Sequence, residues 1–192
     1  RRDRLPLLPC PLSPDRDILI DALRRSSRAA LPRSDPVSSE HAQTTHIIDL
    51  TDQRTGALLH PEWLPRAEAV HRQLRPDLAP HYAGIMAAVF AGGGRMSVAV
   101  RDDVVVGVAV YRVYANTSDG QHMYVDDLVT DSTRRSSGVG QALLDHLQAL
   151  ARAAGCTSFK LDSGCQRQQA HKFYFREGLV VIAFHFRKLL SG

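Results

Sequence analysis

The stretch of sequence that most limits the fold is residues 124–155, YVDDLVTDSTRRSSGVGQALLDHLQALARAAG. A β-rich apolar segment passes through a basic turn into a helix whose apolar residues recur at helical spacing. Gly155 is expected to end that helix, because glycine readily adopts the left-handed cap conformation. A strand needs a sheet to pair with, and an amphipathic helix needs a layer to cover. The segment therefore predicts a mixed α/β protein. The residues expected on one face of the helix are Val139, Leu143, Leu147, Leu150 and Ala154.

The remaining segments after residue 44 predict further strands and helices in a compatible order. The β-branched runs on either side of Asp102 and Asp103 indicate a hairpin. The fold class predicted is α/β (α+β), with a mixed, largely antiparallel central sheet flanked by helices on both faces. Strands are expected at residues 45–51, 95–100, 104–114, 121–130, 157–163 and 179–190, and further helices at 60–74, 79–91 and 167–178.

Charge is distributed unevenly between the two ends of the chain. Residues 1–36 contain eight arginines and five aspartates, and this part accounts for most of the net charge of +4. Residues 1–44 are predicted to be a poorly ordered extension rich in Arg, Pro and Ser, with a short helix near 17–27. Residues 45–192 are predicted to form one domain. Because its charge is nearly balanced, a nucleic-acid partner is not expected.

Cysteine and histidine patterns argue against a metal centre. The three cysteines are an odd number without metal-type spacing, which favours a reducing, cytoplasmic environment. The nine histidines also lack a ligand spacing, so no metal is expected. No apolar run reaches the roughly 18 residues of a membrane span, and no 7–15-residue apolar block of a secretory signal is present. No membrane partner is therefore expected.

The turn at residues 135–140, RSSGVG, is the strongest candidate for ligand binding. A bare Gly-x-Gly can simply make a tight connection, but the start of a helix also offers free N–H groups to an anion. A dinucleotide fingerprint would need glycine at Leu143, and a phosphate-binding Walker loop would need lysine at Gln141. With Arg134 and Arg135 beside it, the turn suits a pyrophosphate.

This turn resembles the Arg/Gln-x-x-Gly-x-Gly/Ala motif of the GNAT superfamily of N-acetyltransferases, which binds the pyrophosphate of acetyl-CoA. Residues 170–179, AHKFYFREGL, are similar to a second segment of that family, and the resemblance covers roughly residues 45–190. Ser136 departs from the usual glycine and Leu179 from the usual aromatic residue. In that family the strand before the turn bulges close to the position of Val129. The resemblance implies the following acetyl-CoA-binding residues: Leu128, Val129, Thr130, Arg134, Arg135, Ser136, Ser137, Gly138, Val139, Gly140, Gln141 and Tyr174.

Acetyl transfer to an amine needs a proton acceptor, because alkylammonium groups lose their proton only near pH ~10. Asp126 and Asp127 are candidates, although adjacent strand residues normally face opposite sides and the choice between them is open. A solvated strand end, or a salt bridge with Arg134 or Arg135, is the alternative explanation for either acid. The resemblance implies that Tyr174 is the general acid for the CoA sulfur.

The predicted function is acetyl transfer from acetyl-CoA to a primary amine in a direct ternary complex. Some likeness of YVDDLVT to polyamine acetyltransferases favours a small cationic amine over a protein lysine or N-terminus. A catalytically silent acetyl-CoA-binding module is the alternative, and a homodimer is plausible by resemblance alone. Weaker candidates for substrate or CoA contacts are Glu68, His71, His81, Tyr82, Gln166, Arg167 and His171, while Cys165 is expected to be structural.

Overall fold

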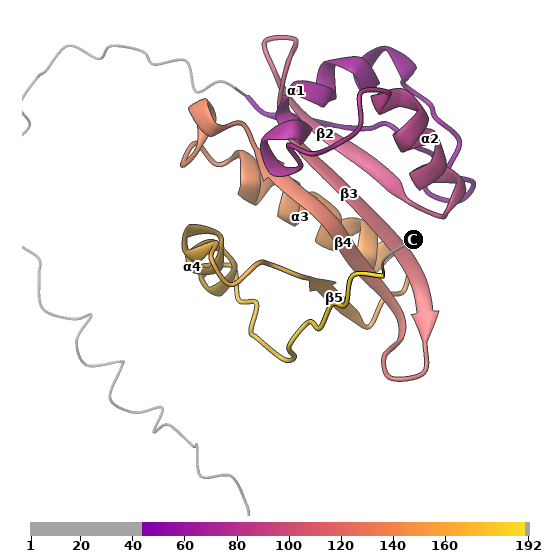
Figure 1. Ribbon diagram of the computed structural model, residues 1–192, viewed down its shortest axis with the longest axis vertical. Helices are drawn as coiled ribbons and strands as arrows, with labels where there is room; N and C mark the ends of the chain where they lie inside the picture. The colour runs from indigo at the N-terminus through magenta and orange to yellow at the C-terminus, as the bar shows by residue number, and fades with distance from the viewer. Residues whose placement is uncertain (1–43, 191–192) are drawn as a thin grey trace, which may run out of the picture. The chain divides into compact units, whose positions relative to one another are not determined.

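The computed structural model describes residues 44–190 of the chain (Figure 1). The predicted extension, including its short helix, lies outside the described residues apart from residue 44. Up to residue 178 the elements follow the expected order, with boundaries shifted by a few residues. They are β1 (His46–Asp49), a short 3₁₀ turn η2 (Pro61–Trp63), α1 (Leu64–Leu74), α2 (Tyr82–Ala91), β2 (Arg95–Arg101), β3 (Val104–Asn116), β4 (Gly120–Thr130), η3 (Ser132–Arg134), α3 (Val139–Ala153), β5 (Ser158–Leu161) and α4 (Gln168–Arg176).

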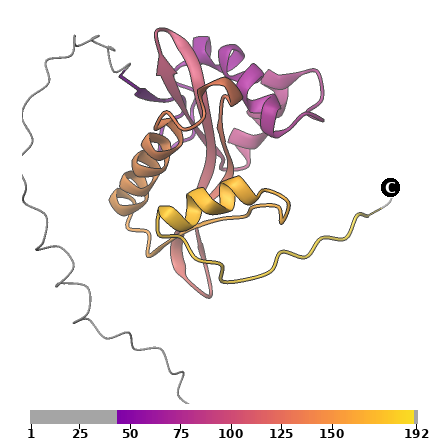
Figure 2. The same cartoon turned by 90° about the vertical axis from the view of Figure 1, so that its left-hand side faces the viewer.

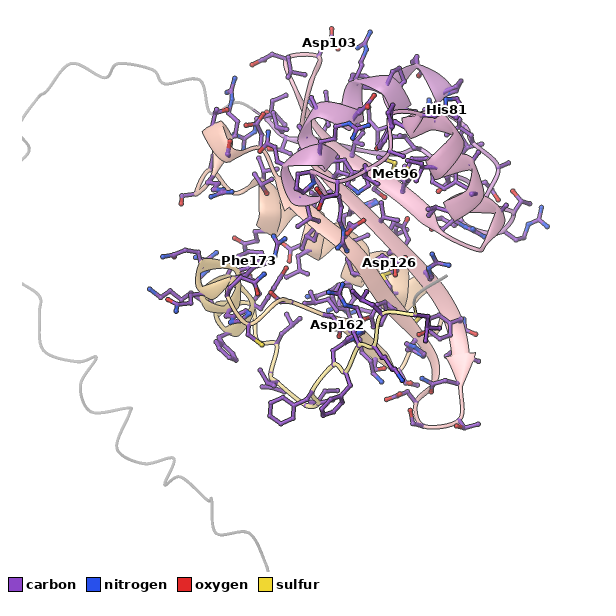
Figure 3. All side chains as sticks on the ribbon, in the orientation of Figure 1. His81, Met96, Asp103, Asp126, Asp162 and Phe173 are labelled. Carbon is purple, nitrogen blue, oxygen red and sulfur yellow. The ribbon has the colours of Figure 1, made fainter. Side chains whose placement is uncertain are left out.

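The strands form one sheet in the order β1-β2-β3-β4-β5. The first four pair antiparallel, and β5 adds to β4 in parallel after the α3 crossover. The β2–β3 hairpin turns through Asp102 and Asp103, whose φ angles of 49° and 59° are both positive. Asp103 stands at the tip of this hairpin (Figure 3). Two consecutive positive φ angles match the turn whose twist suits a two-residue hairpin. The predicted antiparallel core is confirmed.

Helices cover both faces of the sheet, as expected (Figure 2). One apolar cluster packs α1 and α2 against Val98, Val108 and Val110. The other packs α3, through Leu143 and Leu147, against residues on the opposite face. The two clusters take alternate residues of β2 and β3, because successive side chains of a strand point to opposite sides.

The prediction of a final strand over 179–190 is wrong. Residues 179–190 have no strand or helix assignment, and Val181, Phe184 and Phe186 are each more than 70% exposed. A strand exists only when its backbone groups pair with a neighbouring strand. The apolar sequence indicated β propensity but carried no information about such a neighbour. An ion pair between His185 and Asp162, just after β5, connects this segment to the domain.

Candidate active site

The turn between β4 and α3 is stabilised by contacts from within and from the neighbouring hairpin. Asp131 accepts a hydrogen bond from the Thr133 backbone N–H at 2.8 Å. The Ser137 hydroxyl donates to the Arg134 carbonyl at 2.5 Å. Arg101, at the end of β2, donates from Nη2 to the Ser137 carbonyl at 2.6 Å. Arg101 was not predicted from the sequence, because Arg101 and Ser137 are 36 residues apart along the chain. These contacts hold the turn in one conformation.

Gly138 is the N-cap residue of α3 and has φ of 84°, a conformation that favours glycine. No side chain among the described residues caps this helix end, and the first backbone N–H groups of a helix have no partner within it. A Cβ added to Gly140 would lie 3.4 Å from Thr130 Oγ1 and 3.6 Å from Phe173 Cζ. Thr130, Gly140 and Phe173 therefore converge here. The exposed turn can accept an anionic group on backbone N–H donors.

Ser136 has φ of 60°, which an L-residue with a Cβ adopts at a cost of about 1–2 kcal/mol. We expect Ser136→Gly to raise the free energy of unfolding, because glycine removes the strain at this φ. The gain should be at most about 1 kcal/mol, because glycine also gives the unfolded chain more conformational freedom. Thermal or urea unfolding measures the change. Ser137→Gly is the matched control and should destabilise, because it removes the hydrogen bond to Arg134. Equal losses in both variants would contradict the strain at Ser136.

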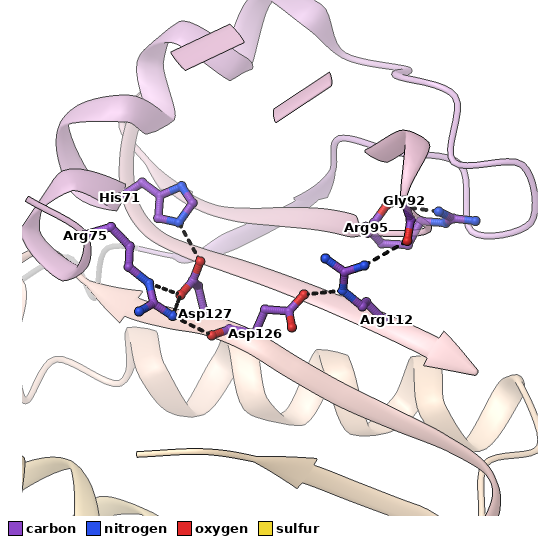
Figure 4. Close-up of polar contacts among 8 residues, drawn as sticks. His71, Arg75, Gly92, Arg95, Arg112, Asp126 and Asp127 are labelled. Carbon is purple, nitrogen blue, oxygen red and sulfur yellow. Dashed lines mark hydrogen bonds and ion pairs between the residues drawn. The ribbon is translucent and has the colours of Figure 1, made fainter. Parts of the chain in front are cut away.

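Asp126 and Asp127 project from the same face of β4, which differs from the alternation expected for a regular strand. Val110 pairs with Asp127, but the next residue of β3, Tyr111, pairs with Val125, so Asp126 is an extra residue in β4. Such a bulge lets neighbouring side chains share a face. Both carboxyl groups lie on the α1–α2 side (Figure 4). The observed irregularity is at Asp126 and not at Val129, where the family resemblance placed it.

Asp127 is held by two donors, His71 of α1 and Arg75 at the C-cap of that helix. Its Oδ2 lies 3.0 Å from His71 Nε2, and its Oδ1 accepts from Arg75 Nε at 2.7 Å. Burial by itself would raise the pKa of this carboxyl, but the hydrogen bonds from His71 and Arg75 outweigh burial and hold the pKa below its usual range. Asp127 is therefore a fixed negative charge at neutral pH.

Asp126 has fewer charged partners and is more accessible. Arg112 of β3 donates from Nε to Asp126 Oδ2 at 2.7 Å, and its Nη1 donates to the Gly92 carbonyl at the end of α2. The Asp126 side chain is 27% exposed, compared with 13% for Asp127. Asp126 therefore lies beside the ionised Asp127. Its Oδ2 accepts from Arg112, and its Oδ1 is not part of that contact.

The lowered pKa of Asp127 makes its contribution to stability depend on pH. That contribution is present above the unfolded-state pKa and is lost as pH falls through the lower folded-state pKa. We expect Asp127→Asn to lower the free energy of unfolding by about 1–3 kcal/mol at pH 7 and by less at pH 3. Urea unfolding at the two pH values measures this. Asp103→Asn, at the exposed hairpin tip, is the control. An equal loss at both pH values would contradict the ionised Asp127.

Tyr174 lies on α4, one residue after Phe173, which approaches Gly140. Burial raises the pKa of the Tyr174 hydroxyl, and Arg167 partly opposes that shift. The hydroxyl is therefore protonated at neutral pH and can donate a proton. The neighbouring Phe175 is 57% exposed. The rings of Phe173 and Tyr174 contact each other in a tilted arrangement, with centroids 5.5 Å apart.

The other residues expected at the turn divide into exposed and buried groups. Val129 and Val139 are buried in the two apolar clusters, so only their backbone can face a ligand. Among the weaker candidates, Glu68 pairs with Arg72, whereas His71 and Tyr82 join the Asp127 network. Arg75, the C-cap residue of α1, and Arg112 of β3 were not predicted from the sequence. The exposed turn residues are Arg134, Arg135, Ser136, Ser137 and Gln141.

Residues 44–190 show neither a metal-binding cluster nor a membrane-spanning helix. Residues 44–190 contain no group of three or more His, Cys, Asp or Glu side chains placed to bind a metal ion. None of the helices in the described part combines the length and apolar character needed to span a bilayer.

A family model described as the acetyltransferase (GNAT) family matches residues 58–178. The uncharacterized N-acetyltransferase YhdJ of Bacillus subtilis (strain 168) is 43% identical over 70 residues, which is 36% of this chain. The match spans about half of that relative, 49% of its length.

Solved structures share the fold. A putative acetyltransferase from Agrobacterium tumefaciens str. C58 is 26% identical with a TM-score of 0.60, over 68% of this chain and 95% of that one. The aminoglycoside N-acetyltransferase AAC(6')-Iy in complex with CoA is 18% identical with a TM-score of 0.61, over 83% of this chain and 99% of that one.

Proposed function

Because the chain belongs to the GNAT family of acetyltransferases, we propose that it transfers an acetyl group from acetyl-CoA to a small cationic amine in a direct ternary complex. The observation that carries this proposal is the pair of carboxyl groups, Asp126 and Asp127, on one face of β4. They lie a few residues before the anion-binding turn. A site for acetyl transfer needs both features. The turn would bind the CoA phosphates, and the carboxyl groups would attract the ammonium group and accept its proton.

The turn supports acetyl-CoA binding by its shape and its charge. Backbone N–H groups at the start of α3 would bind the pyrophosphate, with Arg134 and Arg135 as nearby cations. Acetyl-CoA, when bound there, supplies the thioester that is attacked. Leu128 to Thr130 at the end of β4 would line the pantetheine arm, and a backbone N–H near Val129 would stabilise the developing oxyanion.

We assign different roles to the two acids. Asp127, held ionised by His71 and Arg75, attracts and orients the cationic amine. Asp126 accepts the proton of the ammonium group, directly or through a water, because it is the more accessible of the two and has one arginine partner. Tyr174, kept protonated by burial, returns a proton to the leaving sulfur.

The charge arrangement favours a small cation over a neutral acceptor. Two adjacent carboxyl groups on one face raise the local concentration of positive charge near the reacting atoms. Each acid has one arginine partner: Arg75, whose side chain is 52% exposed, pairs with Asp127, and Arg112, which also donates to the Gly92 carbonyl, pairs with Asp126. The proposal requires a small amine to reach this face between the two arginines.

The test measures release of free thiol from acetyl-CoA over a panel of polyamines, aminoglycosides, lysine peptides and neutral-acceptor controls. We expect release with at least one small cationic amine and the lowest KM for acceptors with two or more positive charges. Tight CoA binding without release for any acceptor would support a silent acetyl-CoA-binding module instead. Release with lysine peptides alone would overturn the acceptor class.

A further inference from the structure

A buried line of hydrogen bonds leads from α2 through α1 to Asp127. The Tyr82 hydroxyl lies 2.9 Å from His71 Nδ1, and His71 Nε2 lies 3.0 Å from Asp127 Oδ2. The side chain of His71 is 3% exposed, and Tyr82 is buried to the same degree. The two rings meet edge to face, with centroids 5.7 Å apart. The imidazole is thus held on both nitrogens by different elements.

The chemistry of the two end groups determines the hydrogen positions on the neutral imidazole. Burial, together with the negative charges of Glu68 and Asp127, raises the pKa of Tyr82, so its hydroxyl stays protonated and can donate. Asp127 is ionised and can only accept. One neutral tautomer satisfies both ends: Nδ1 accepts from Tyr82, and the Nε2–H donates to Asp127.

We propose that Tyr82 and His71 form a positioning pair, in which Tyr82 fixes the Nε2–H tautomer of His71 and His71 fixes the charge and direction of Asp127. This inference rests on the proposed function for its catalytic consequence. His71 and Tyr82 act through Asp127 and touch no reacting atom. Their role concerns the binding of the cationic acceptor, because Asp127 is the anion that attracts it.

The other charged groups near His71 and Tyr82 have partners of their own. The charged groups around His71 and Tyr82 are Glu68 and Arg72 of α1, Arg75 at its C-cap, and Asp127 of β4. Glu68 is paired with Arg72, whose Nη1 donates to the Leu78 carbonyl at 2.5 Å. Arg75 contacts the other oxygen of Asp127 and is half exposed. His71 is therefore the buried donor that holds Asp127, and Arg75 is the exposed one.

The first measurement is the ¹⁵N NMR spectrum of the His71 ring in the full chain, which distinguishes the two neutral tautomers from the imidazolium ion. We expect the Nε2–H tautomer in the wild type and loss of that single state in Tyr82→Phe. A wild-type Nδ1–H tautomer, or an unchanged tautomer in Tyr82→Phe, would overturn the proposal. This readout needs no turnover, so it decides the inference even if no amine proves to be a substrate.

The second measurement is steady-state kinetics with the best cationic amine. His71→Leu removes the donor and should raise KM for the amine by about tenfold to a hundredfold, with a smaller change in kcat. His71→Gln, which can donate and accept at once, should recover part of that loss. KM for acetyl-CoA should not change. Thermal unfolding with and without CoA checks that each variant is folded. Equal changes in both KM values would overturn the positioning role.

Discussion

Replacing Tyr174 by phenylalanine should lower kcat for acetyl transfer by about a hundredfold to ten-thousandfold while CoA still binds. The substitution removes one hydroxyl and keeps the aromatic ring that packs on α4 beside Phe173. Because burial keeps that hydroxyl protonated, its loss removes a proton donor and not a charge. Thiol release measures kcat, and calorimetric titration measures the affinity for CoA.

Tyr114→Phe is the matched control for Tyr174→Phe. Tyr114 lies on β3, is 45% exposed, and contacts the ring of His122. The same chemical change there should leave kcat close to the wild-type value. If Tyr174→Phe kept most of its turnover, a water would have to protonate the leaving sulfur. If it lost CoA binding in parallel, Tyr174 would be a binding residue and not the general acid.

The second large effect is expected for Asp126→Asn. The asparagine keeps the size of the side chain and an oxygen that can accept from Arg112, but it cannot take a proton at neutral pH. We expect kcat to fall by about a hundredfold or more, with a rise in activity at high pH, where a larger fraction of the free amine is already neutral. The kcat of the variant and the wild type, measured from pH 6 to pH 10, tests this.

Asp119→Asn is the control for the loss of a paired carboxylate. Asp119 forms an ion pair with Lys160, and its side chain is 24% exposed, close to the 27% of Asp126. It lies in the β3–β4 turn, away from the two acids. Asp119→Asn should leave kcat close to the wild-type value.

A comparison with Asp127→Asn separates the roles of the two acids further, since Asp127→Asn should raise KM for the amine more than it lowers kcat. The opposite division would exchange the roles of the two acids.

The local part of the site was predictable from the sequence because it depends on neighbours along the chain. The strand, the basic turn and the helix of residues 124–155 carry their own signals of apolar spacing and glycine placement. The hairpin at Asp102 and Asp103 was predictable for the same reason. The two family motifs then predicted which turn would bind the pyrophosphate and which tyrosine would protonate the CoA sulfur, and both remain predictions.

The partners of the two acids were not predictable, because they come from segments far away in the sequence. His71 and Asp127 are 56 residues apart, and Arg75 and Asp127 are 52 residues apart. Alternation along a strand predicted that Asp126 and Asp127 face opposite sides. The extra residue in β4 reverses that outcome, and a bulge exists only relative to the neighbouring strand β3.

The sequence by itself determined the mixed α/β fold, the order of the elements up to residue 178 and the glycine turn before α3, because propensity, periodicity and glycine conformation act within a few residues. The tertiary structure decided that Asp127 is held by His71 and Arg75 and that Asp126 is the more accessible acid. It also decided that residues 179–190 do not pair in the sheet. Those outcomes depend on hydrogen bonds and burial between distant segments, and such contacts exist only once the chain has folded.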